Sequence, residues 1–130
     1  MSSAVTKLPR AFRKIRLELA REKDHPAGDP RRGYFISVPL DAEHRIDADL
    51  WKEYRDNFRV VRFRPDQDDD IGHLIHRPGG TWTLRYDIRG TDEEEAPFHF
   101  EYERFEVGEY VSIREADGMH TYQVITVEPV

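Results

Sequence analysis

The feature that most constrains the fold of this chain is an alternation of apolar and charged residues with a period of two. In the segment 12–22, Ile15 and Leu17 lie between charged residues, and residues 33–39 and 81–88 alternate in the same way. Successive side chains of a β-strand point to opposite faces, so this pattern is typical of strands that bury one face. A helix would scatter the same residues around its circumference.

Eight segments carry this pattern and are separated by turn residues. The expected strands cover residues 12–22, 33–39, 58–64, 71–77, 81–88, 97–105, 109–115 and 119–127. Glycine and proline occupy connections such as 78–80, where tight turns favour them. The sequence therefore predicts a mainly β chain, with a single antiparallel sheet of about eight strands that is closed or folded as a small barrel or sandwich.

One segment departs from the β pattern and predicts a short helix near residues 47–56. The carboxylate of Asp47 can cap its first turn. Leu50, Trp51 and Tyr54 follow at a spacing that forms one apolar stripe along a helix. We expect this helix to cover an open end or an edge of the sheet.

Length and composition indicate one domain. The chain has 130 residues and no cysteine, which excludes disulfides and thiolate metal sites and fits a reducing, cytoplasmic compartment. Residues 1–11 show neither the strand pattern nor the helix pattern and are expected to form a flexible tail. A single β-rich domain is expected over 12–130. No stretch approaches the roughly 20 apolar residues that a membrane-spanning helix needs, so we expect no membrane partner.

The two halves of the chain carry opposite charge. Residues 1–65 hold 15 Lys and Arg against 10 Asp and Glu, whereas residues 66–130 hold 5 against 16, which gives balances of +5 and −11. Such asymmetry bears on partners rather than on fold. Acidic residues interleave with the basic ones in the first half and the net charge is −6, so nucleic acid is an unlikely partner on this composition.

Two acidic runs fall in expected loops. They consist of Asp66, Asp68, Asp69, Asp70, Asp92, Glu93, Glu94 and Glu95. In an up-and-down meander every second loop lies at the same end, so both runs would meet there beside the turn at 115–117. We call this predicted surface the acidic pole. The function expected from it is non-enzymatic binding of a basic protein partner or of a second copy of the chain; loops that only maintain solubility are the alternative explanation.

Aromatic residues support a second functional hypothesis, a carrier of a small apolar ligand. The candidate pocket residues, on apolar faces of neighbouring expected strands, are Trp82, Tyr86, Phe98, Phe100 and Tyr102. They would either line a barrel cavity or fill the core, as is usual in small barrels. A carrier requires a cavity on the order of several hundred Å³.

A third hypothesis is a small hydrolase-type enzyme that uses His99 and Glu101, which share one face of the strand expected over 97–105. That face is expected to be solvated, and water weakens the electrostatic effects on which catalysis depends. The chain contains no nucleophile elbow and no phosphate-binding loop. No catalytic residue, metal site or cofactor is therefore predicted, and an enzyme is the less favoured class. The sequence leaves open a chemical role for His73, His76, His99 and His120.

Overall fold

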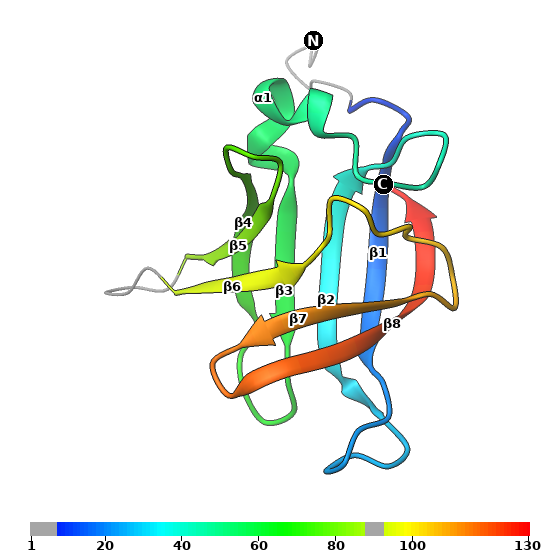
Figure 1. The fold of residues 1–130 in the computed structure, drawn as a ribbon, viewed down its shortest axis with the longest axis vertical. Coiled ribbons are helices and arrows are strands. Elements are labelled where there is room, and N and C mark those ends of the chain that lie inside the picture. Colours follow the sequence, from blue (N-terminus) through cyan, green and yellow to red (C-terminus); the bar gives the residue numbers. More distant parts are fainter. Residues whose placement is uncertain (1–7, 88–92) are drawn as a thin grey trace, which may run out of the picture.

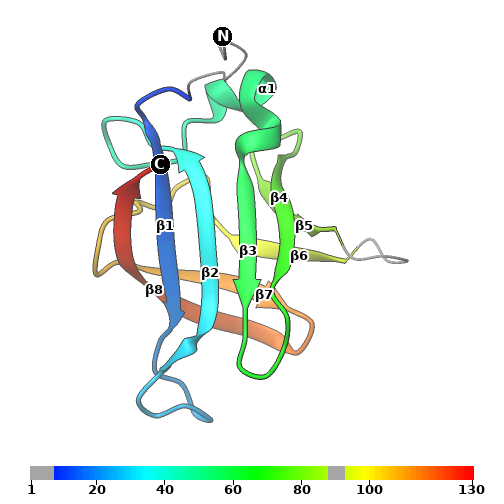
Figure 2. The same ribbon diagram turned by 180° about the vertical axis from the view of Figure 1, so that it is seen from behind.

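The computed structural model describes residues 8–87 and 93–130. Eight antiparallel strands follow one another around a closed barrel, and β1 pairs with β8 to close it (Figures 1 and 2). The strands are β1 (Phe12–Leu19), β2 (Asp29–Pro39), β3 (Arg59–Phe63), β4 (Asp70–His76), β5 (Trp82–Tyr86), β6 (Glu94–Phe98), β7 (Tyr110–Glu115) and β8 (Gly118–Pro129). The predicted mainly β fold is confirmed, and of the predicted alternatives the structure is the barrel. Closure gives each of these strands a partner on both sides.

Because the barrel is an up-and-down meander, its loops alternate between two ends. The connections β1–β2, β3–β4 and β7–β8 belong to the end that is lower in Figure 1. The helical segment and the connections β4–β5 and β6–β7 belong to the upper end. We refer to them below as the lower end and the upper end.

One expected strand is wrong. The other seven agree with the structure to within four residues at each boundary, but the strand expected over 97–105 is replaced by β6, which ends at Phe98. The chain turns at His99, whose φ is +52°, a backbone conformation that interrupts a strand. As a result Phe100 is buried, whereas Phe98 and Tyr102 are 50% and 68% exposed.

Parts of two fold predictions lie outside the described residues. These parts are residues 1–7 of the expected tail and residue 88, the last residue of the strand expected over 81–88. Of the remaining tail residues, Leu8 packs against the barrel core.

The helical segment lies at the upper end, above β3 (Figures 1 and 2). It consists of three short pieces: η1 (Ala48–Leu50), α1 (Trp51–Tyr54) and η2 (Arg55–Asn57). Asp47 caps it as predicted, because its carboxylate accepts a hydrogen bond from the backbone N–H of Asp49 at 3.1 Å. The indole of Trp51 donates to the carbonyl of Leu74 at 3.0 Å and holds the segment against β4. Within the described residues, no helix has the length and apolar character required to cross a membrane.

Aromatic side chains fill the upper end of the barrel interior. Phe58 packs edge-on against Phe12 with ring centroids 5.7 Å apart and stacks on Trp82 at 5.6 Å. Phe100 and Phe105, from the β6–β7 connection, form another edge-on pair at 5.2 Å. All five are buried, so this end is a packed apolar core.

Two glycines permit close approach of neighbouring strands. A Cβ on Gly33 would lie 1.8 Å from the carbonyl oxygen of Leu17, and one on Gly72 would lie 2.0 Å from that of Arg85. No other residue fits such contacts without movement of the backbone. Both positions allow the sheet to bend as it closes into a barrel.

Candidate functional site at the lower end

The lower end of the barrel interior holds polar side chains. They come from six different strands and are Tyr34, Arg62, Tyr86, Glu95, Glu115 and Tyr122. We call this set the tyrosine–carboxylate cluster. Its members face inward because each occupies the inward phase of its strand; Tyr34, for example, is in phase with the buried Ile36 and Val38.

Three tyrosine hydroxyls connect two carboxyl groups across the barrel. The hydroxyl of Tyr34 lies 2.9 Å from Oε1 of Glu95 and 2.7 Å from Oε2 of Glu115. Tyr86 donates to the same Oε1 of Glu95 at 2.6 Å, and Tyr122 donates to the same Oε2 of Glu115. Tyr34 is thus the bridge between the two carboxyl groups.

Counting protons constrains the state of this bridge. Burial raises the pKa of all three tyrosines, so their hydroxyls keep their protons. The tyrosines and the two carboxyl groups make four oxygen–oxygen contacts, but the three hydroxyls supply only three protons. The fourth contact is a full hydrogen bond only when one carboxyl group is protonated. Burial raises the pKa of Glu95, although the hydrogen bond from Tyr86 and the charge of Arg62 oppose the shift. The carboxyl group of Glu95 therefore takes up a proton at a higher pH than an exposed glutamate does.

Arg62 is the cation of the cluster. Its Nη1 lies 2.6 Å from Oε2 of Glu95 and 3.0 Å from Oε1 of Glu93, and its Nε and Nη2 donate to Oδ2 of Asp70 at 2.9 and 2.5 Å. Its guanidinium also lies 4.4 Å above the ring of Tyr86. Burial alone would lower the pKa of Arg62, but Asp70 and Glu95 raise it, so the residue stays charged.

The first acidic run of the predicted acidic pole divides into two groups. Asp66, Asp68 and Asp69, in the β3–β4 loop, are exposed and form no ion pair with a described cation. Asp70 instead bonds to Arg62 and, at 2.7 Å, to Arg64. We call the three exposed aspartates the acidic loop.

The second acidic run is largely neutralised by arginines of the barrel strands and their connections. Asp92 lies outside the described residues. Glu93 and Glu95 pair with Arg62. Glu94, on the outer face of β6, contacts Arg85 at 2.7 Å and Arg77 at 3.1 Å; the hydrogen bond from Arg85 is the main cause of its lowered pKa. Consequently the structure places the described residues of this run in ion pairs with arginines of the same chain.

The aromatic residues of the carrier hypothesis are not brought together around a cavity. Trp82 and Phe100 belong to the packed upper end, and Tyr86 belongs to the tyrosine–carboxylate cluster. Phe98 and Tyr102 are exposed on the outside of the barrel.

The histidine and carboxylate of the enzyme hypothesis do not share a strand face. His99 occupies the turn after β6, and Glu101 follows it in the same irregular segment. The expected pairing was wrong because the alternation of aromatic residues continues past the point where the backbone turns. The imidazole of His99 packs against Phe98 instead, with ring centroids 4.0 Å apart.

Four residues of the tyrosine–carboxylate cluster were not identified from the sequence as functional: Tyr34, Arg62, Glu115 and Tyr122. A local signal for Arg62 does exist, because it follows Val60 in the inward phase of β3. A charged residue at an inward position indicates a buried partner. The identity of that partner is not readable from the sequence, because Glu95 is 33 residues away.

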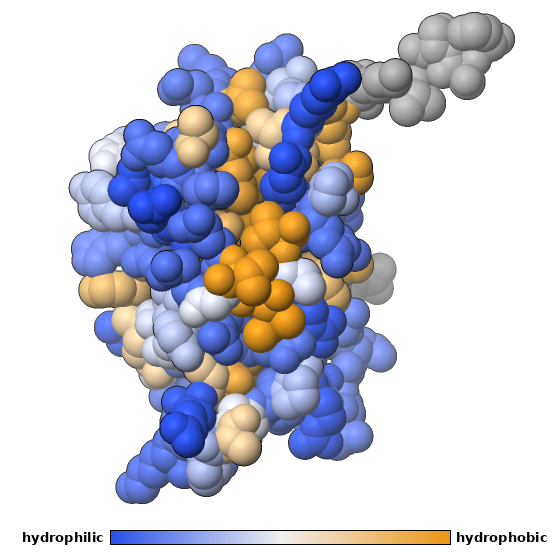
Figure 3. Space-filling view, turned by 90° about the vertical axis from the view of Figure 1, so that its right-hand side faces the viewer, coloured by the Kyte–Doolittle hydropathy of each residue, from blue (hydrophilic) through white to orange (hydrophobic). Residues whose placement is uncertain are grey.

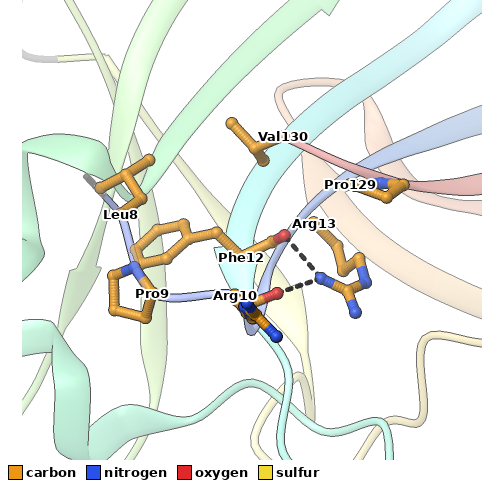
Figure 4. A pocket seen from close by; sticks show the side chains of 7 residues that line it. All are labelled: Leu8, Pro9, Arg10, Phe12, Arg13, Pro129 and Val130. Carbon is orange, nitrogen blue, oxygen red and sulfur yellow. Dashed lines mark hydrogen bonds between the residues drawn. The ribbon is translucent and has the colours of Figure 1, made fainter.

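Two hollows on the outer surface are weaker candidates. One, of about 520 Å³, lies between the residues before β1 and the end of β8 and is lined by Leu8, Pro129 and Val130 among others (Figure 4). Another, of about 400 Å³, lies beside Val107 and Val127, and an apolar strip marks this side of the molecule (Figure 3). Neither contains a buried charged side chain, whereas the lower end contains Arg62 and Glu95.

No protein-family model, curated protein or solved structure matches this chain. The fold and the lower end define a closed eight-stranded barrel with a polar interior at one end and an exposed acidic loop beside it. A functional proposal therefore depends on this geometry alone.

Proposed function

We propose that this protein is a non-enzymatic binding protein whose acidic loop docks a basic segment of a partner protein. The observation that carries the proposal is the exposure of Asp66, Asp68 and Asp69 without a described cationic partner. The nearest arginines in sequence, Arg62 and Arg64, are already engaged by Asp70. The negative charge of the loop is therefore free to act on another molecule.

The tyrosine–carboxylate cluster supports docking by holding the base of the acidic loop. Arg62 on β3 and Asp70 on β4 flank the loop and are bonded to each other, and Arg62 is anchored to Glu95 inside the barrel. A charged surface on a rigid base loses less conformational entropy on binding. Complementary charge then increases the association rate and discriminates against acidic partners.

Docking is better supported than carriage of an apolar ligand, because the aromatic residues expected to line a cavity are packed in the core or exposed outside.

We propose a cytoplasmic location on the ground that a cysteine-free chain suits a reducing compartment. The proposed partner is a basic protein segment; binding to a second copy of the chain is an alternative outcome of the test below.

The test uses a charge-reversed variant with Asp66, Asp68 and Asp69 all changed to Lys. Acetyl-tetra-arginine amide serves as the probe, and its citrulline analogue, which is neutral and nearly isosteric, serves as the control ligand. We expect salt-sensitive binding of the arginine peptide by isothermal titration calorimetry, with the affinity reduced at least about tenfold in the variant.

The matched control variant changes Asp49, Glu53 and Asp56 to Lys. These residues are exposed at the upper end, so the control makes the same change in net charge at the other end of the barrel. It should retain peptide binding. Equal loss in both variants would show that only net charge matters, and an absence of binding to the unmodified protein would reject docking of basic segments. Concentration-dependent mass by sedimentation, abolished by the loop variant, would identify a second copy as the occupant instead.

A further inference from the structure

The β7–β8 hairpin brings three potential metal ligands together at the lower end. Glu115 ends β7, Asp117 lies in the two-residue turn and His120 is the third residue of β8. Pairing of Glu115 with Gly118 closes the turn, so residues spaced i, i+2 and i+5 meet. One ligand atom from each of the three lies within 4.8 Å of the others.

Neighbouring residues orient two of these ligands. Glu22, from the β1–β2 connection, lies 3.0 Å from Nδ1 of His120, which leaves Nε2 directed at Oδ1 of Asp117 at 2.7 Å. Tyr34 donates to Oε2 of Glu115 at 2.7 Å. Metal-binding histidines commonly direct their second ring nitrogen to a carboxylate, and metal-binding carboxylates are themselves hydrogen-bonded.

We propose that Glu115, Asp117 and His120 bind a divalent transition-metal ion, of which Zn²⁺ is the best match. One imidazole nitrogen and two carboxylate oxygens are donors that Zn²⁺ uses at sites with an open coordination position. The imidazole disfavours Mg²⁺ and Ca²⁺, which prefer oxygen ligands. This site goes beyond the docking function, because it includes no residue of the acidic loop.

The geometry requires only a small adjustment to bind metal. Ligand atoms about 2 Å from a zinc ion lie at most about 4 Å apart, so the three side chains must approach one another by about 1 Å. Asp117 can make this movement because its side chain is 70% exposed. The competing state is an ion pair in which a protonated His120 donates to both Glu22 and Asp117, since a proton and a metal ion cannot share Nε2.

The experiment titrates the full chain, prepared without a polyhistidine tag and freed of metal with EDTA, with ZnCl₂ in a calorimeter. We expect one saturable site per chain and a higher unfolding temperature in the presence of Zn²⁺. The substitutions Asp117→Asn and His120→Gln should each weaken binding at least about tenfold, and Glu22→Gln should weaken it about 10- to 100-fold. Asp117 is exposed, so its variant tests the site without endangering the fold.

His73→Gln is the matched control, because His73 also faces a carboxylate, that of Asp87 at 3.8 Å, outside the proposed site. It should bind Zn²⁺ as the unmodified protein does, and MgCl₂ should give no comparable binding. The proposal is overturned by an absence of saturable Zn²⁺ binding, by full binding in both the Asp117→Asn and His120→Gln variants, or by equal affinity for Mg²⁺. The charge-reversed acidic-loop variant should keep Zn²⁺ binding, which separates failure of this site from failure of docking.

Discussion

The two ends of the barrel interior are filled by chemically opposite means. At the upper end Phe58 and Trp82 stack in an apolar core, whereas at the lower end Arg62 and Glu95 are buried within a hydrogen-bonded cluster. Apolar packing tolerates incomplete contacts at a graded cost. A buried polar cluster stabilises only when every member is paired, because each unpaired charge in the interior is strongly unfavourable. We therefore expect substitutions at the lower end to depend on pH and those at the upper end to be independent of it.

The largest effects should separate the two ends by their response to pH. Phe58→Ala should reduce the free energy of unfolding by about 4 kcal/mol at any pH, because it leaves a cavity. Arg62→Met should reduce it by about 3 kcal/mol at neutral pH, because Glu95 and Asp70 lose their cation, and by less near pH 5, where a buried Glu95 without that cation takes up a proton more readily. Urea denaturation followed by circular dichroism at both pH values measures this difference.

Arg59→Met provides the control for the arginine substitution. Arg59 lies on the same strand but is exposed, so its replacement should change the free energy of unfolding by no more than about 0.5 kcal/mol. If Arg62→Met were equally mild, or as damaging near pH 5 as at neutral pH, the lower end would not differ from the upper end as described.

A smaller effect should come from the hydroxyl that bridges the two carboxyl groups. Tyr34→Phe retains the ring but leaves Glu95 and Glu115 without their shared partner, so we expect a loss of about 1.5 kcal/mol. Tyr110→Phe, at an exposed position of β7, should be nearly neutral in the same denaturation measurement. A neutral Tyr34→Phe would indicate that the bridge contributes nothing to stability.

The smallest effects should distinguish the two faces of β6. Glu94 has a lowered pKa, so it contributes stability above its ordinary pKa of 4.5 that is lost as the pH falls through its folded value. Glu95 has a raised pKa, so it contributes stability below 4.5 that is lost as the pH rises through its folded value. Relative to the unmodified protein, Glu94→Gln should therefore become less stable with rising pH, and Glu95→Gln more stable.

The change in the free energy of unfolding for Glu94→Gln should stay below about 1 kcal/mol, because the ion pairs of Glu94 are at the surface. The measurement is the free energy of unfolding across the range from about pH 3 to pH 7. Slopes of the same sign in the two variants would contradict the assignment of opposite environments to these adjacent residues.

The fold was more predictable than the candidate site. Residues such as Ile15 and Leu17 alternate with charged neighbours, and the alternation is a local property that indicates a strand without knowledge of its partners. Asp47 likewise caps the helical segment through the backbone N–H of a residue two positions away. The error over 97–105 came from the same rule, because a change of φ at His99 is not encoded in apolar periodicity.

Seven of the eight strands and their antiparallel order could be predicted from the sequence, because they follow from local alternation of apolar and charged residues and from the turns between them. Which acidic side chains remain free depends on contacts between strands and cannot be read from local pattern. Asp68 and Asp70 are alike in the sequence, but Asp70 begins β4 opposite Arg62 of β3, whereas Asp68 stays in the exposed loop. The charge that a residue presents to solvent depends on partners brought near by folding, and closure of the barrel supplies those partners from distant strands.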